Sequence, residues 1–227
     1  MGWSDPVAAY CERQAPGMTG EPLNALTNVA FLAAAFALCH LQRRRRADGV
    51  PLANDIVMLP WLVAGVGICS LLFHTLAVRW AGSLDSLSIL LYCAVAIHAF
   101  MRHAAQSSER SALIAAAGFA VISVALSKLA GPQVLNGSAA YLPNIIALIA
   151  VSTYSYRRGA LAWRGFTLAS AIFVVALALR TADRAWCASL PSGTHFLWHL
   201  LAALMIWLVS RELTLQRFAP YAAHTAN

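Results

Sequence analysis

The sequence predicts an all-α fold, a bundle of seven transmembrane helices. The first observation is composition: 60% of the residues are hydrophobic and only 11% are charged, whereas soluble domains carry about 25% charged residues. A water-soluble fold of 227 residues could not hide so much apolar surface. The second observation is that the apolar residues fall into seven runs. The third is that short loops join these runs, and most of the basic residues lie in the loops.

Each apolar run is long enough to cross a bilayer, which takes about 20 mostly apolar residues in a helix. In chain order the runs cover residues 22–41, 55–77, 84–102, 111–129, 140–156, 165–181 and 194–213. The connections leave no room for a second, soluble domain, and no internal repeat is evident. We therefore expect residues 1–227 to form a single transmembrane domain.

The basic residues in the loops predict the orientation of the bundle. Eleven of them flank the loops after the first, third, fifth and seventh runs: Arg43, Arg44, Arg45, Arg46, Arg102, Arg110, Arg157, Arg158, Arg164, Arg211 and Arg217. The opposite side holds five: Arg13, Arg79, Lys128, Arg180 and Arg184. By the positive-inside rule, the N-terminus lies outside and the C-terminus is cytoplasmic. This distribution also argues against a nucleic-acid partner, because nucleic-acid binders cluster their charge on a polar face.

Five polar residues inside the predicted spans should lie at one depth. Ser70 and His74 are four apart at the end of the second run, and His195 and His199 are four apart at the start of the seventh. Residues four apart share a helix face. Asp85 falls in the first turn of the third run. The predicted topology puts all five near the outer ends of their helices, and polar residues within spans are functional suspects.

The three histidines match a catalytic zinc centre, in which neutral imidazoles leave a fourth position open. Zinc held in this way lowers the pKa of its bound water to about 7. Asp85 would orient a histidine or act as general base, and Ser70 would hydrogen-bond the water or a developing oxyanion. The alternative is that the histidines are interior or interfacial polar groups, which is the interpretation we give to His40, His98 and His103.

Other cofactors fit the pattern less well. The only lysine, Lys128, lies at the outer end of the fourth run, so the bundle has no Schiff-base lysine for retinal. Two histidines on one helix face cannot both be axial ligands of a haem. The HxxxH pair also lacks the glutamate of the HExxH zinc-protease helix.

Several segments together resemble the alkaline ceramidase family, within a wider group that includes adiponectin-type receptors and lipid-remodelling hydrolases of GPI anchors. The matching segments are YCE, GEPLNALTN, SLLFHT, LDSLSILLY, DRAWCASL and THFLWH. The combination of Ser-xxx-His, an Asp eleven residues after that His, and HxxxH is specific, whereas each part alone is weak. The likeness covers nearly the whole chain.

The resemblance implies zinc ligation by His74, His195 and His199, with Ser70 and Asp85 at the reaction centre. It implies that the substrate is ceramide or a related N-acyl lipid, which would be cleaved to a fatty acid and a sphingoid base. A receptor of the adiponectin type and a hydrolase of another membrane lipid remain alternatives. Short loops and tails favour the enzyme, the YCE and WCASL segments favour the ceramidase branch, and no protein partner is implied.

The resemblance also points to a calcium site near the N-terminus. The residues that correspond to it are Glu12, Glu21 and Asn24. Ala9 and Tyr10 stand where the family usually has Asp and Trp, and the spacing between the two glutamates is short. The alternative for Glu21 is a first-turn charge favoured by the helix dipole.

Two cysteines on the outer side, Cys11 and Cys187, match family positions. We hypothesise a disulfide between them that ties the N-terminal segment over the mouth of the site. Asp183 is either a group supporting the metal ligands or a loop charge. The remaining cysteines lie within spans and are interpreted as small apolar fillers: Cys39, Cys69 and Cys93.

Overall fold

The computed structural model describes residues 2–14, 17–131 and 134–216, and within them seven helical segments are long and apolar enough to cross a membrane. These residues contain no β-strand, so the all-α prediction is confirmed. In chain order the elements are α1 (Pro22–Thr27) with α2 (Val29–Ala47), α3 (Asn54–Leu76), α4 (Arg79–Ala99) with η1 (Phe100–Ala104), α5 (Glu109–Ala130), η2 (Val134–Tyr141) with α6 (Leu142–Arg157), α7 (Ala162–Ala182) with η3 (Asp183–Trp186), and α8 (His195–Leu215).

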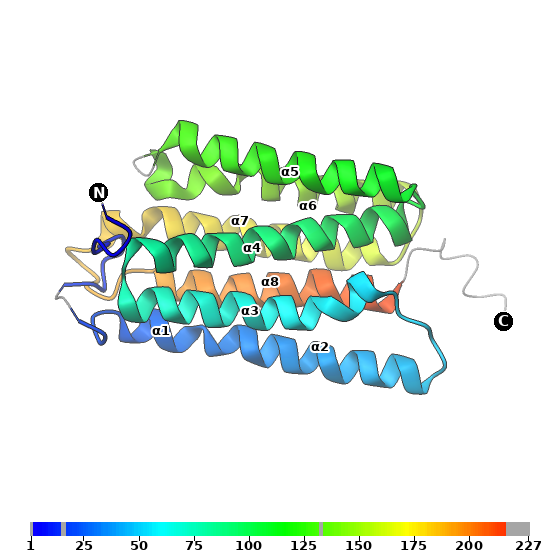
Figure 1. Cartoon of the computed structure of the whole chain (residues 1–227), viewed down its shortest axis with the longest axis horizontal. Coiled ribbons are helices and arrows are strands. Elements are labelled where there is room, and N and C mark those ends of the chain that lie inside the picture. Colours follow the sequence, from blue (N-terminus) through cyan, green and yellow to red (C-terminus); the bar gives the residue numbers. More distant parts are fainter. Residues whose placement is uncertain (1, 15–16, 132–133, 217–227) are drawn as a thin grey trace.

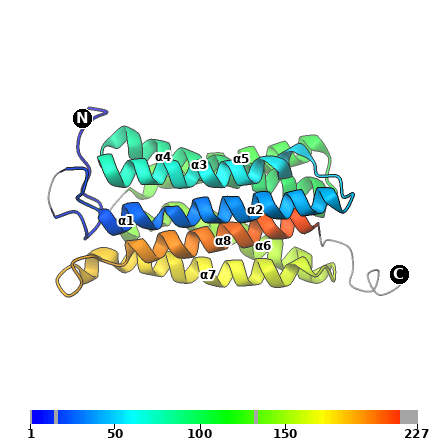
Figure 2. The ribbon, with the colours of Figure 1, turned by 90° about the horizontal axis from the view of Figure 1, so that it is seen from below.

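The helices lie side by side along the long axis of the molecule (Figure 1). Residues 2–14 and the starts of α1, α4 and α8 are at one end of the bundle, and α8 finishes at the other end (Figures 1 and 2). Because α3 finishes where α4 starts, the C-terminal turn of α3 is also at the first end. The polar residues singled out in the sequence are carried by the helix ends that meet there.

Helix α8 is the centre of the bundle and the most buried of the seven spans. It packs against α7, α2, α3, α1 and α4. Small residues let its neighbours approach closely, as in other membrane bundles. On α7, a side chain at Gly165 would displace the side chain of Glu212 on α8.

The outer face of the bundle is apolar. Large side chains that are mostly exposed include Phe36, Trp61, Val121 and Leu129. Helix α5 is the least buried span. An apolar face this extensive is expected where lipid rather than water is the solvent.

The helix α4 starts five residues before the apolar run that predicted it, at Arg79 rather than residue 84. The carbonyls of Asp5 and Trp3 accept hydrogen bonds from the N–H groups of Arg79 and Trp80, at 3.2 and 3.1 Å. The N-terminal segment thus satisfies helix donors that would otherwise be free. Asp85 is therefore in the second turn of α4, and its predicted place in the first turn is wrong.

Candidate metal centre

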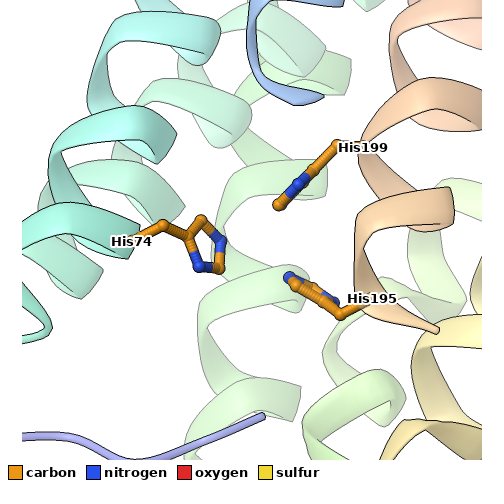
Figure 3. A group of neighbouring side chains, drawn as sticks. All are labelled: His74, His195 and His199. Carbon is orange, nitrogen blue, oxygen red and sulfur yellow. The ribbon is translucent and has the colours of Figure 1, made fainter. Parts of the chain in front are cut away.

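Three buried histidines from two helices converge at one end of the bundle. His74 is in the last turn of α3, and His195 and His199 are one turn apart at the start of α8 (Figure 3). One ring nitrogen from each can be chosen so that all lie within 4.8 Å of one another. Tetrahedral zinc with Zn–N bonds of about 2.0–2.1 Å holds its nitrogens about 3.3 Å apart. The three ring nitrogens are thus grouped closely enough that the residues could hold a metal ion.

Polar groups from α1 and the residue before it orient two of the three imidazoles. The carboxylate of Glu21 lies 2.6 Å from Nδ1 of His74, and the hydroxyl of Thr27 lies 3.0 Å from Nδ1 of His199. Both rings are therefore held through Nδ1, which leaves Nε2 for a metal. Nδ1 of His195 is buried without a hydrogen-bond partner among the described residues.

Ser70 and Asp85 lie in the same cavity as the histidines of α8. Ser70 is buried one turn before His74 on α3, and its hydroxyl approaches the side chain of Asp85. The second carboxylate oxygen, Oδ1, is buried and has no hydrogen-bond donor among the described residues. An unpartnered buried carboxylate oxygen beside three imidazoles is suited to accept a proton or to bind a water.

The cavity extends from this polar end far into the apolar bundle. Its lining includes His195 at the start of α8 and Leu213 near its end, a distance of about 27 Å at 1.5 Å per residue. Most of the lining side chains between them are apolar, among them Phe166, Phe173 and Ile206. The mostly apolar lining suits a hydrocarbon chain with its polar end at the histidines.

The N-terminal segment is fastened to the connection between η3 and α8 by a disulfide, and to the start of α8 through a buried carboxylate. Cys11 and Cys187, the pair of the sequence hypothesis, are bonded. Asp183 accepts hydrogen bonds from the N–H groups of Thr194 (2.7 Å) and His195 (2.9 Å) through Oδ1, and from Cys11 N–H (3.0 Å) through Oδ2. It thus caps the helix that carries His195 and His199, so Asp183 is not a free loop charge.

The three residues that correspond to a calcium site already have partners within the chain. Both oxygens of Glu12 accept backbone N–H groups, from Leu23 at 2.6 Å and Asn24 at 2.8 Å. Glu21 binds Asn24 and His74, and its other oxygen lies 2.5 Å from Nε of Arg13. Burial alone would raise the pKa of Glu21, but these donors outweigh it and hold the pKa below its ordinary value.

The model of the Ceramidase family matches residues 7–218, nearly the whole chain. The chain belongs to the Ceramidase family. No curated protein matches the sequence. Membership makes the protein a hydrolase that acts on amide bonds, with ceramide as the broad class of substrate. The resemblance on which the sequence analysis relied is thereby confirmed.

Arg180 lies at the site of this ceramidase, although the sequence indicated it only as a charge on the outer side. The guanidinium is buried, lines the cavity, and donates to the carbonyl of Asn136 (2.7 Å) and the hydroxyl of Ser138 (2.9 Å). It also lies over the ring of Tyr10, and this ring stacks with that of His195, with centroids 3.5 Å apart. Burial raises the pKa of Tyr10 although the Arg180 charge opposes it. An arginine inside an apolar run was the signal for this role.

The other histidines that the structure describes lie away from the centre. His98 and His103 both bind the carboxylate of Asp55, at 3.0 and 2.9 Å, at the opposite end of the bundle. His40 is exposed. The three half-buried cysteines of the spans, Cys39, Cys69 and Cys93, carry free thiols.

Proposed function

We propose that the chain is a zinc-dependent ceramidase that works within the membrane, with His74, His195 and His199 as ligands. The observation that carries this proposal is the convergence of three buried imidazoles and one unpartnered carboxylate oxygen at the polar end of a long apolar cavity. The donor set is the one zinc takes in open catalytic sites, three histidines with a free fourth position. The substrate is an N-acyl lipid of the ceramide class.

Zinc held by these histidines would supply a bound water with a pKa near 7 and a positive charge beside the amide carbonyl. Asp85 accepts a proton from that water, since its oxygen Oδ1 has no hydrogen-bond donor in the part of the chain that the structure describes. The new C–O bond forms at the acyl carbon as the C–N bond breaks, and Asp85 returns the proton to the departing amine. One water is therefore consumed: its oxygen enters the fatty acid, and one of its protons enters the free amine.

Ser70 and the apolar cavity serve binding and orientation. The Ser70 hydroxyl holds Asp85 in place and is available to the oxygen on which negative charge develops. The acyl chain lies along α8 among Phe166, Phe173 and Ile206.

The decisive experiment is fatty-acid release from a panel of ceramides by detergent-purified protein, run beside His199→Ala. We expect the wild type to release fatty acid and to contain about one zinc per chain by elemental analysis. His199→Ala should lose the zinc and lower the activity by at least about 100-fold, because the metal would keep only two of its three imidazole ligands. The exposed His40→Ala is the matched control and should behave as the wild type.

Two results would overturn the proposal in different ways. Near-normal turnover by His199→Ala would remove the zinc assignment. Zinc binding by the wild type without release from any ceramide, but with release from glycerolipid esters, would keep the metal centre and replace the substrate. The panel therefore includes one diacylglycerol lipid.

A further inference from the structure

A buried arginine links the N-terminal segment to the zinc ligand on α3. The Arg13 side chain is only 8% exposed, and its three kinds of nitrogen have different partners. Nε lies 2.5 Å from Oε1 of Glu21, Nη2 donates to the carbonyl of His74 at 3.0 Å, and Nη1 donates to the carbonyl of Gly17 at 3.1 Å. Arg13 therefore contacts both the ligand His74 and the acid that orients it.

Glu21 needs a permanent positive partner to hold His74. The glutamate is 3% exposed, and an unpaired carboxylate at that depth would be costly. His74 cannot provide the charge, since a metal ligand must be a neutral imidazole. Asn24 donates to Glu21 at 3.1 Å but is uncharged. Among the described residues in contact with Glu21, Arg13 alone brings a permanent positive charge.

The site around Glu21 does not fit a calcium ion. Calcium takes six to eight oxygen ligands at about 2.3–2.6 Å. Both oxygens of Glu12 are used by backbone N–H groups at the start of α1, and both oxygens of Glu21 are used by Arg13, His74 and Asn24. Of the side-chain oxygens matched to such a site, Oδ1 of Asn24 alone has no partner within the described residues.

We propose that Arg13 takes the place of a divalent cation at Glu21 and is a positioning residue for the zinc ligand His74. The guanidinium neutralises Glu21 and fixes its direction, and Glu21 fixes the ring of His74 through Nδ1. Zinc binding is then independent of calcium. This inference rests on the zinc site of the proposed function, so its test measures zinc affinity rather than turnover.

The first arm of the test uses the wild-type protein, stripped of metal and titrated with zinc against a fluorescent zinc chelator. We expect the same zinc Kd with and without calcium at about 1 mM. This calcium concentration is at the upper end of the dissociation constants of extracellular calcium modules, about 0.1–1 mM. A Kd that tightens 10-fold or more on adding calcium would overturn the inference. A wild type that binds no zinc would instead overturn the proposed function.

The second arm compares Arg13→Ala, Glu21→Gln and the double variant in the same titration. Loss of a group that orients a ligand costs about 10–100-fold in metal affinity. We expect each single variant to weaken zinc binding by that amount, and the double variant to equal Glu21→Gln, because Arg13 acts through Glu21. Additive losses, or wild-type affinity in Arg13→Ala, would overturn the inference.

Two further variants guard against a merely structural effect. Arg184→Ala removes the same charge from an exposed position at the same end of the bundle and should leave the zinc Kd unchanged. Arg13→Lys keeps the charge but not the fork of donors, and should recover part of the lost affinity. If Arg13→Ala does not fold, Arg13→Lys and the calcium arm still decide the question: a wild-type zinc Kd in Arg13→Lys would overturn the role of the guanidinium fork.

Discussion

In the proposed reaction, two single residues handle the proton: Asp85 accepts and returns it, and Ser70 orients Asp85. The carboxylate shares the cavity with His195 and His199, and Ser70 holds it from α3. Neither group is needed to complete the set of imidazole ligands. Proton handling and metal binding are therefore separable by mutation.

Asp85→Asn should lower kcat by about 10²–10⁴-fold, the usual contribution of a general acid–base group. The amide has nearly the shape of the carboxylate but cannot accept the proton. Zinc content should stay at the wild-type level, which elemental analysis checks on the same preparation used for kinetics. A loss of zinc together with activity would mean that Asp85 supports the metal rather than the proton transfer.

Among the elements, α8 is held in position by contacts of the residues just before its first turn. Asp183 accepts the N–H groups of Thr194 and His195, and the next residue back, Gly193, has φ +63°. A Cβ at Gly193 would collide with Asp183 and lie 2.8 Å from Cβ of Cys11. The loop before α8 therefore accepts only glycine at this point.

Gly193→Ala should lower the melting temperature and weaken zinc binding, since it strains the backbone and displaces the carboxylate that caps α8. The free energy of unfolding should fall by at least about 1 kcal/mol. Gly118→Ala in α5 is the matched control: its Cβ would meet nothing within 4 Å, so stability should be unchanged or slightly higher. Equal behaviour of the two variants would show that the capping contact does not matter for the site.

The disulfide between Cys11 and Cys187 joins residues 176 apart in sequence and closes nearly the whole chain into a loop. Reduction should lower the free energy of unfolding by about 2–4 kcal/mol. Thermal unfolding in detergent with and without reductant measures this, in a background where the three free cysteines are alanine. An unchanged melting temperature would mean that hydrogen bonds alone hold the N-terminal segment.

The two ends of the whole bundle differ. The candidate metal centre and the disulfide lie at one end, and the arginines at the end of α2 lie at the other. We propose that the metal end faces outward and the arginine end faces the cytoplasm, following the excess of basic residues. The disulfide agrees with this orientation, since such bonds persist outside the cytosol.

A membrane-impermeant thiol reagent applied to intact cells checks the orientation. Met18→Cys, an exposed position beside the metal end, should be labelled, whereas the exposed Asp48→Cys after the arginines should be labelled only after lysis. The reverse pattern would place the site on the cytoplasmic side. Both variants are made with the three free cysteines replaced.

The sequence by itself determined the number of spans and their order, and it singled out the three histidines that the structure brings together. Hydropathy alone defines apolar runs, and four-residue spacing puts Ser70 with His74 and His195 with His199 on single helix faces. The boundaries were less certain, because hydropathy does not register helical turns made of polar or mixed residues. Thus α2 continues through its arginines, which are good helix formers, and α4 starts at Arg79.

Only the tertiary structure decided how the site is supported. Arg13, Glu21 and Asp183 act through partners 8 to 172 positions away in sequence, so no local pattern could assign their hydrogen bonds. The direction of each side chain depends on packing between helices, which also buries Arg180 among aromatic rings. Periodicity determines which face of a helix a residue occupies, whereas the contacts of that face are determined by the other helices.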